Sequence, residues 1–142
     1  MDYTKLAEEF LHRVHMFRKF KPQQQISESM HGEFFVLQHI ALRESHVIPS
    51  EISDAMNISS ARIAVTLNSL ESKGHITRQI DTSDRRRILI KLTPEGKKRA
   101  ENDRRMLLDT IVKMLMLLGE HDAKEYIRIT GRMAELAQNC EQ

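Results

Sequence analysis

A chain of 142 residues, 40% of them hydrophobic and 30% charged, is long enough to bury one core and too short for two independent ones. Its single cysteine, Cys140, excludes a disulfide framework and a multi-cysteine metal site, and we expect it to be a free thiol. No long uncharged apolar stretch occurs at the N-terminus or elsewhere, so we expect a cytoplasmic protein without a membrane partner.

The basic residues are concentrated in one segment. Residues 76–105 contain ten Lys and Arg against five Asp and Glu, whereas the whole chain has a formal net charge of only +2. A localised positive patch is typical of a surface that binds phosphate groups. A solvated helix face gives a similar excess, so charge alone does not identify the partner.

The first part of the chain predicts two amphipathic helices. Six large apolar residues, spaced by three and four from Tyr3 to Phe20, lie on one side of a helix that ends near Lys21-Pro22. A broad apolar face over residues 30–41 indicates a second helix. The apolar side of the first helix needs a partner surface to cover it.

Two short helices joined by a tight turn come next. The first covers residues 50–56, with Ser50 as its expected cap, and the turn at 57–60 provides a new cap for a helix over about 60–73. Gly74 stands where a left-handed residue ends that helix. The pattern predicts a helix-turn-helix.

After these helices the pattern changes to alternating β-branched residues. Strands are predicted at 76–80 and 88–92, and the polar, arginine-rich segment 81–87 between them indicates a hairpin with a basic tip. Thr93-Pro94 predicts the cap and first residue of a long helix. Gly119 breaks that helix, and a last helix completes the chain.

A helix-turn-helix followed by a basic hairpin is suited to double-stranded DNA. The second helix fits the major groove, which is about 12 Å wide, while the hairpin reaches the adjacent backbone or minor groove. Arg62, Val65, Asn68 and Ser69 are expected to face outward on the second helix. Arg62 and Asn68 can reach base edges, and Val65 can contact a thymine methyl group. At the hairpin tip, Asp84 can hold an arginine by a salt bridge. The candidate DNA-binding residues are Ser50, Ser59, Ser60, Arg62, Val65, Asn68, Ser69, Asp84, Arg85, Arg86 and Arg87.

Three motifs carry a family resemblance: Pro49-Ser50-Glu51-Ile52, Leu70-Glu71-Ser72-Lys73-Gly74-His75-Ile76, and Asp84-Arg85-Arg86-Arg87 followed by Leu92-Thr93-Pro94-Glu95-Gly96. With them, the chain from about Phe35 to Gly96 resembles the MarR family of bacterial transcriptional regulators. The resemblance implies that Asp84 and Arg86 form the Asp-x-Arg pair of the wing and that the Leu-Thr-x-x-Gly motif opens the long helix. The sequence departs from the family at Val65 and Ser69, where Arg or another polar residue is common, which leaves more of the expected base contacts to Arg62.

The resemblance also implies an architecture: a mainly α (α+β) fold, with a winged helix-turn-helix and a helical dimerisation region. Residues 1–142 then form one domain, in which about 35–96 bind DNA while about 1–25 and 97–142 form the dimer. The resemblance further implies that a homodimer binds a palindromic operator and that a small molecule or a redox signal controls this binding. We expect a repressor that is released by a small-molecule effector.

The effector itself is not identified by the sequence. The candidate effector-binding residues lie near the junction of the first two helices, where core packing explains the apolar ones equally well: His12, His15, Met16, Met30, His31 and Phe34. An alternative is a zinc-type metal-responsive regulator of the same fold, since the chain has seven histidines and His39, His121 and Glu33 are further possible ligands. No cofactor is predicted.

Two other classes of function are alternatives to DNA binding. An enzyme is disfavoured because the chain lacks a Gly-rich phosphate loop, a His-Glu-x-x-His motif and a Gly-x-Ser-x-Gly motif. A helical protein-interaction module that does not bind DNA is the remaining alternative. The basic hairpin argues against it, and a salt-dependent DNA-binding assay separates the two.

Overall fold

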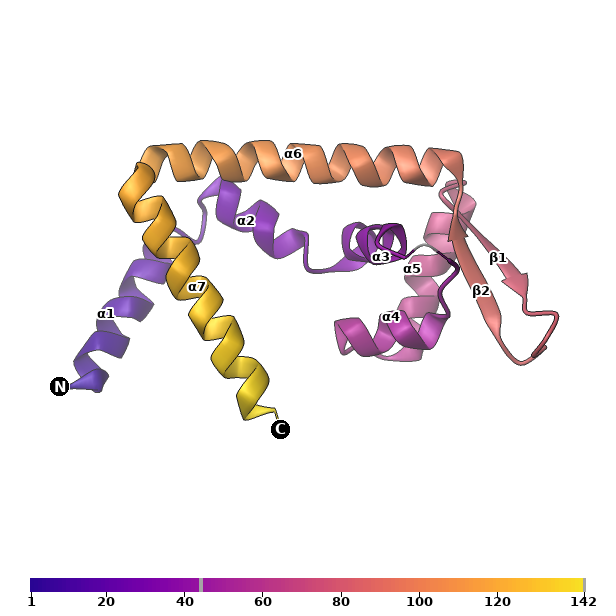
Figure 1. The fold of residues 1–142 in the computed structure, drawn as a ribbon, viewed down its shortest axis with the longest axis horizontal. Coiled ribbons are helices and arrows are strands. Elements are labelled where there is room, and N and C mark those ends of the chain that lie inside the picture. The colour runs from indigo at the N-terminus through magenta and orange to yellow at the C-terminus, as the bar shows by residue number, and fades with distance from the viewer. Residues whose placement is uncertain (44, 142) are drawn as a thin grey trace. The chain divides into compact units, whose positions relative to one another are not determined.

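The computed structural model describes residues 1–43 and 45–141, which fall into two compact units, Met1–Leu107 and Leu108–Gln142. Figure 1 shows the helices and strands of the described residues along the chain. In order they are α1 (Tyr3–Met16), α2 (Lys21–Glu28), α3 (Gly32–Ala41), α4 (Pro49–Met56), α5 (Ser60–Ser72), β1 (Ile76–Ile80), β2 (Ile88–Leu92), α6 (Pro94–Leu118) and α7 (Glu120–Cys140).

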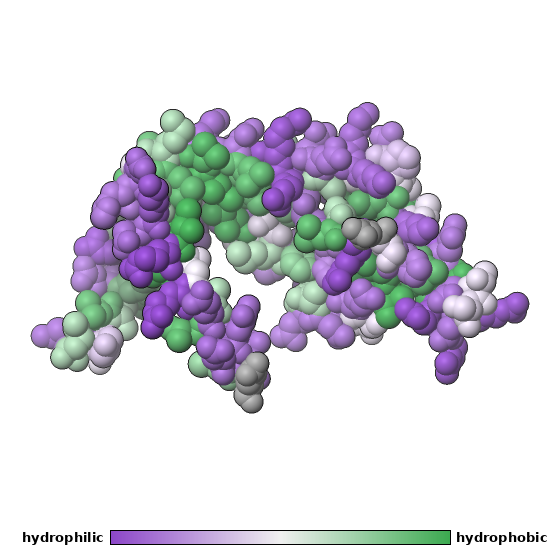
Figure 2. Space-filling model, viewed as in Figure 1, coloured by the Kyte–Doolittle hydropathy of each residue, from purple (hydrophilic) through white to green (hydrophobic). Residues whose placement is uncertain are grey.

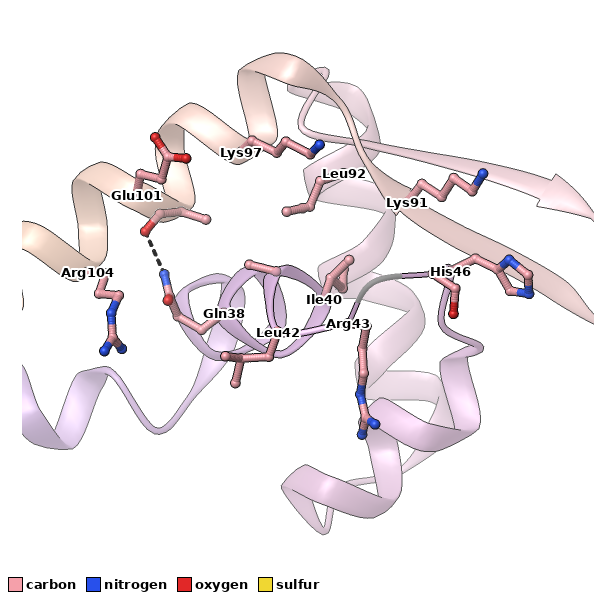
Figure 3. A pocket seen from close by; sticks show the side chains of 13 residues that line it. Gln38, Ile40, Leu42, Arg43, His46, Lys91, Leu92, Lys97, Glu101 and Arg104 are labelled. Atoms are coloured by element: carbon pink, nitrogen blue, oxygen red, sulfur yellow. Dashed lines mark hydrogen bonds between the residues drawn. The ribbon is translucent and has the colours of Figure 1, made fainter.

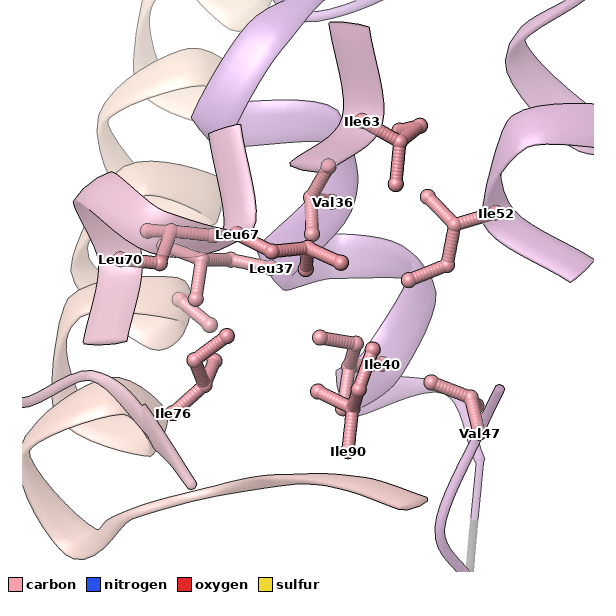
Figure 4. Close-up of a cluster of buried hydrophobic side chains, with 11 residues drawn as sticks. Val36, Leu37, Ile40, Val47, Ile52, Ile63, Leu67, Leu70, Ile76 and Ile90 are labelled. Atoms are coloured by element: carbon pink, nitrogen blue, oxygen red, sulfur yellow. The ribbon is translucent and has the colours of Figure 1, made fainter. Parts of the chain in front are cut away.

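The hydrophobic core of the first unit is formed by α3, α4, α5, both strands and the first turns of α6. Figure 4 shows its buried side chains, which are Val36, Leu37, Ile40, Val47, Ile52, Ile63, Leu67, Leu70, Ile76, Ile90 and Ala100. On α5 the buried residues recur at i, i+4 and i+7, which is the spacing of one helix face. The other faces of α5 are thereby left for contacts outside the core.

The N-terminal helices differ from the prediction. The first helix ends at Met16, earlier than expected, and Lys21–Glu28 forms a separate helix, α2, that was not predicted. Pro22 does not stop a helix here but lies in the first turn of α2. Proline is accepted there because the first backbone N–H groups of a helix have no partner within the helix.

The helix-turn-helix is confirmed, with one correction at its start. The cap of α4 is Ile48 and Pro49 opens the helix, so Ser50 lies inside the helix and the prediction that it caps it is wrong. Asn57 ends α4 in a left-handed conformation, with φ 52° and ψ 46°. Ser59 caps α5 as the sequence indicated, since its side chain accepts a hydrogen bond from the backbone N–H of Arg62 at 3.3 Å.

The hairpin is confirmed over the predicted strands. Strand β1 pairs antiparallel with β2, so that Ile76 lies opposite Leu92 and Ile80 opposite Ile88. On its other side, β2 pairs with Val47 through two backbone hydrogen bonds. The Val47 N–H donates to the Ile90 carbonyl at 3.1 Å, and the Ile90 N–H donates to the Val47 carbonyl at 2.8 Å. The base of the hairpin is therefore held from both sides, whereas the segment 81–87 projects beyond the sheet as the tip of the wing.

The long helix α6 begins and ends as predicted. The Thr93 hydroxyl accepts a hydrogen bond from the Gly96 N–H at 3.0 Å and donates one to the Gly74 carbonyl at 2.6 Å. In the second unit, α6 ends at Leu118, and Gly119, with φ 84°, separates it from α7. No described helix is long and uncharged enough to cross a membrane.

Candidate nucleic-acid interface

One face of α5 is free of the core. Arg62, Val65 and Asn68 are exposed, as predicted, and the Val65 side chain is 69% exposed although it is apolar. An exposed valine between two polar residues gives this face both hydrogen-bonding groups and a methyl-sized apolar surface. These are the groups that read the edges of base pairs in a major groove.

Ser69 does not belong to this face, and the prediction that it points outward is wrong. It is half-buried, and its hydroxyl donates a hydrogen bond of 2.7 Å to Glu33 Oε1 on α3. Lys73, the C-cap of α5, lies four residues after Ser69 and donates to the same carboxylate, with Nζ 2.8 Å from Glu33 Oε1. Ser69 and Lys73 are therefore directed toward the start of α3.

The N-terminus of α5 is exposed at Ser59 and Ser60. Ser59 uses its oxygen to accept the backbone N–H of Arg62, and its own hydroxyl hydrogen remains available to donate. The unpaired backbone N–H groups of the first helical turn and the positive end of the helix dipole favour an anion at this position.

The tip of the wing is organised around Asp84. Its Oδ1 accepts hydrogen bonds from the backbone N–H and from Nε of Arg86, each at 3.1 Å, while its carbonyl accepts the backbone N–H of Arg87 at 2.9 Å. The Arg86 side chain is nevertheless 92% exposed. The ion pair that the sequence predicted is therefore present, and it holds the guanidinium group in solvent at the end of the hairpin.

Asp81 is a second anchor of the tip, which was not predicted from the sequence. Its carboxylate accepts hydrogen bonds from Oγ and the backbone N–H of Ser83, at 2.7 and 2.9 Å, and these bonds lower the pKa of Asp81 below its ordinary value. Its backbone N–H donates to the Arg87 carbonyl at 3.0 Å, which closes the turn. An Asp two residues before a Ser is the local signal for such a turn.

The other arginines of the tip add to its positive charge. Arg85 is exposed and makes no hydrogen bond or ion pair with the described part of the chain, and Arg87 lies 3.9 Å from Asp81 Oδ2. In Figure 2, hydrophilic side chains project from the region where Figure 1 places the wing. A narrow minor groove, which has a strongly negative potential, attracts such guanidinium groups.

Arg78 on β1 reaches back to the recognition helix. Its Nη2 donates to Asn68 Oδ1 at 2.7 Å, and its Nε and Nη2 donate to the two carboxylate oxygens of Glu71 at 3.2 and 3.0 Å. These bonds lower the pKa of Glu71 and raise that of Arg78 from their ordinary values. No local motif indicates this contact, because it joins a helix to a strand.

Glu33, a possible metal ligand by its sequence, is occupied by protein cations. Lys73 Nζ, at the C-cap of α5, and Arg99 Nη1, on α6, each lie 2.8 Å from its carboxylate. Partial burial raises the pKa of Glu33, but hydrogen bonds from Lys73, Ser69 and Arg99 outweigh this and lower it from 4.5 to about 2. Glu33 thus ties the start of α3 to the recognition helix and to α6.

The predicted effector residues are not gathered into one pocket. His12, His15 and Met16 are exposed on α1, Met30 and His31 are exposed before α3, and only Phe34 is half-buried. Among residues 1–43 and 45–141, no three His, Cys, Asp or Glu side chains are arranged to hold a metal ion. Effector binding by these six residues stays a prediction.

A pocket of about 790 Å³ lies elsewhere in the first unit, between the end of α3, the loop that follows it, β2 and the first turns of α6. Figure 3 shows Gln38 at its inner wall, where its Nε2 donates to the Ala100 carbonyl at 2.7 Å. Its basic lining residues are Arg43, Lys91, Lys97 and Arg104. None of the six predicted effector residues lines it.

Residues 33–111 match the protein family described as the winged helix DNA-binding domain, and this segment contains α5 with its exposed face and the wing. The chain belongs to this winged helix family. A curated relative, the HTH-type transcriptional repressor MdtR of Bacillus subtilis, is 28% identical over 130 residues, which cover 89% of this chain and 83% of MdtR.

Solved winged helix structures have the same fold. A MarR transcriptional regulator from Methanosarcina mazei has a TM-score of 0.68 at 19% identity, covering 96% of this chain and 99% of that one. FabT of Streptococcus pneumoniae, crystallised in complex with DNA, has a TM-score of 0.65 at 22% identity, and the match covers 99% of this chain and 98% of FabT. The predicted MarR-type fold is confirmed, and the chain is a transcriptional regulator and not an enzyme.

Proposed function

We propose that this winged helix regulator is a homodimeric repressor that binds a palindromic operator through α5 and the wing and is released by a small-molecule effector. The observation that carries the proposal is the pair of surfaces in the first unit, the exposed face of α5 and the arginine-rich tip held by Asp84. A repressor among the relatives and a DNA complex among the structures support it.

The two surfaces suit different parts of the DNA. The face of α5 offers Arg62, Val65 and Asn68 to base edges, while Ser59 and Ser60 offer hydroxyl groups to the phosphate backbone. The Arg86 side chain is held by Asp84 and is 92% exposed, so its guanidinium group can bind in the minor groove or to the phosphate backbone beside it. Specificity is therefore assigned to the helix and sequence-independent affinity to the wing.

Dimerisation is inferred from uncovered apolar surface. Neither α1 nor α7 has a buried residue, and both carry large exposed hydrophobic side chains. On α1 these are Tyr3, Leu6, Phe10, Leu11 and Met16, and on α7 they are Tyr126, Ile127, Ile129, Met133 and Leu136. Apolar surface on this scale is characteristic of a protein interface, and a two-fold dimer matches a palindromic operator.

The DNA-binding roles are tested by comparing two arginine variants on selected and random DNA. Arg86→Ala should weaken binding to both, because a wing arginine acts on phosphates and groove potential. Arg62→Ala should weaken binding mainly to the selected site, by about 1 to 3 kcal/mol of discrimination. Equal losses on both DNAs for Arg62→Ala would show that this residue does not read bases.

Release by an effector follows from the geometry of a dimer. Two recognition helices engage successive major grooves only when they lie about 34 Å apart, so an effector that favours another spacing releases the DNA. Linkage requires the operator to weaken effector binding by the same factor. Calorimetric titration of a candidate compound with and without operator tests this, and identical affinities would exclude that compound as the signal.

A further inference from the structure

The contact between Arg78 and Asn68 bears on how α5 reads DNA. Asn68 lies on the exposed face of α5, and Arg78 lies on β1, ten residues later in the chain. The hydrogen bond from Arg78 Nη2 to Asn68 Oδ1 is 2.7 Å long. The Arg78 side chain is only 25% exposed, so it lies in the space between the recognition helix and the wing.

The chemistry of the two groups determines how the Asn68 amide is turned. A guanidinium group has only donors, and in an amide side chain only the oxygen accepts. Asn68 Oδ1 must therefore face Arg78, which turns the Nδ2 amino group away from it. The two N–H groups of Nδ2 have no partner in residues 1–43 and 45–141 and remain free to donate.

Arg78 is itself held in place by Glu71. Its Nε and Nη2 donate to both carboxylate oxygens of Glu71, at 3.2 and 3.0 Å. A two-point contact between guanidinium and carboxylate fixes the plane of the guanidinium group as well as its position. Glu71 and Asn68 are three residues apart on α5, so one turn of the helix carries both partners of Arg78.

We propose that Arg78, fixed by Glu71, is a positioning residue that orients the Asn68 amide as a donor, so that α5 selects a base with acceptors on its major-groove edge. Guanine, with N7 and O6, fits best. Adenine fits less well, because its usual pair of bonds with asparagine needs the amide oxygen to accept from N6, and that oxygen is turned toward Arg78. The inference rests on the proposed placement of α5 in the major groove.

The test starts with selection of DNA from a random pool by the full-length protein and its variants. Wild-type protein should select guanine at one position of each half-site that Asn68→Ala no longer specifies. Arg78→Ala should lose the preference at that same position and keep the others, and the double variant should lose no more than either single variant. Arg85→Ala is the matched control, since this wing arginine contacts neither Asn68 nor Glu71 and should lower affinity without changing the selected sequence.

A second measurement tests whether Asn68 binds N7 of the selected guanine. Replacing the selected guanine by 7-deazaguanine removes N7 and should weaken wild-type binding roughly 3- to 10-fold, the value of one hydrogen bond. The same replacement should leave binding by Asn68→Ala and Arg78→Ala unchanged. If Arg78→Ala does not fold, Arg78→Lys replaces it, because one ammonium group cannot hold Glu71 at two points and orient Asn68 together.

Four results would overturn the inference. A uniform loss of affinity for all DNA in Arg78→Ala would show that Arg78 contacts phosphate and does not act through Asn68. Selection of adenine at the Asn68 position, with a loss of affinity when its N6 amino group is removed, would show that the amide oxygen accepts from the base. A wild-type pool without a consensus would overturn the proposed function together with the inference, whereas a consensus unchanged by Arg78→Ala overturns the inference alone.

Discussion

Gly96 in the first turn of α6 lies directly against the backbone carbonyl of His75, so closely that a Cβ at Gly96 would stand 1.9 Å from the His75 oxygen. The same oxygen accepts the backbone N–H of Thr93 at 3.1 Å. The start of α6 thus crosses the segment between α5 and β1 at backbone contact. This explains in steric terms why the Leu-Thr-x-x-Gly motif ends in glycine.

Gly96→Ala is therefore expected to destabilise the protein by about 1 to 3 kcal/mol, because one of the two backbones must move. Urea unfolding followed by circular dichroism measures the loss. Lys98→Ala, on an exposed position of the same helix, is the control and should stay within about 0.5 kcal/mol of the wild type. If the two variants were equally stable, the close contact would not exist in solution.

Removing the charge of Glu33 should weaken the contacts that hold α3, α5 and α6 together and so destabilise the fold. Glu33→Gln leaves Lys73 and Arg99 without their shared carboxylate, and we expect a loss of about 1 to 3 kcal/mol at neutral pH. Glu101→Gln, which removes an exposed carboxylate without an ion pair among the described residues, is the control.

The pH dependence of this loss has a defined sign. The pKa of Glu33 is lowered from 4.5 to about 2 in the folded protein, so its contribution is complete above pH 4.5 and disappears as the pH falls toward 2. The difference in stability between wild type and Glu33→Gln should shrink over this range. A difference that is constant from pH 7 to pH 3 would mean that the ionised carboxylate is not the stabilising group.

Local signals in the sequence were sufficient for much of the fold. The two strands, the left-handed Gly74 with φ 76°, the Ser59 cap and the Thr93 cap were predicted because each depends on residues within a few positions of it. Pro22 was misread, since proline is found both where helices end and where they begin, and the residues after it decide between the two.

The site was predictable only where its parts are adjacent in sequence. The Asp84 and Arg86 pair lies within one turn and was expected. Ser69 was assigned to the wrong face because its partner, Glu33, is 36 residues away. Contacts between distant elements leave no spacing pattern in a single sequence.

Thr93 should be sensitive to loss of its hydroxyl group, which both caps α6 and donates to the Gly74 carbonyl. Thr93→Val keeps the shape of the side chain but removes both bonds, at an expected cost of about 1 to 2 kcal/mol. Thr93→Ser retains the hydroxyl group and should recover most of this. Thermal unfolding of the two variants under identical conditions makes the comparison.

The oligomeric state should depend on the apolar residues of α1. Sedimentation of the wild type should give twice the 16.6 kDa mass of one chain. Phe10→Asp, at a side chain that is 67% exposed on α1, should shift the protein toward monomer at micromolar concentration. Leu42→Asp, at an exposed leucine outside α1 and α7, should sediment like the wild type. A monomeric wild type would remove the basis for palindromic recognition.

The pairing of Ile90 with Val47 has a consequence for motion in the wing. Strand β2 is held on both sides at Ile90, but only by β1 at Ile88, and beyond that the tip is held by its own turn. Local opening should therefore become easier along the hairpin, with the slowest exchange of amide hydrogen at Ile90 and the fastest in the tip. Such a gradient allows the arginines to follow the local width of a groove while the base of the hairpin keeps its position on the recognition helix.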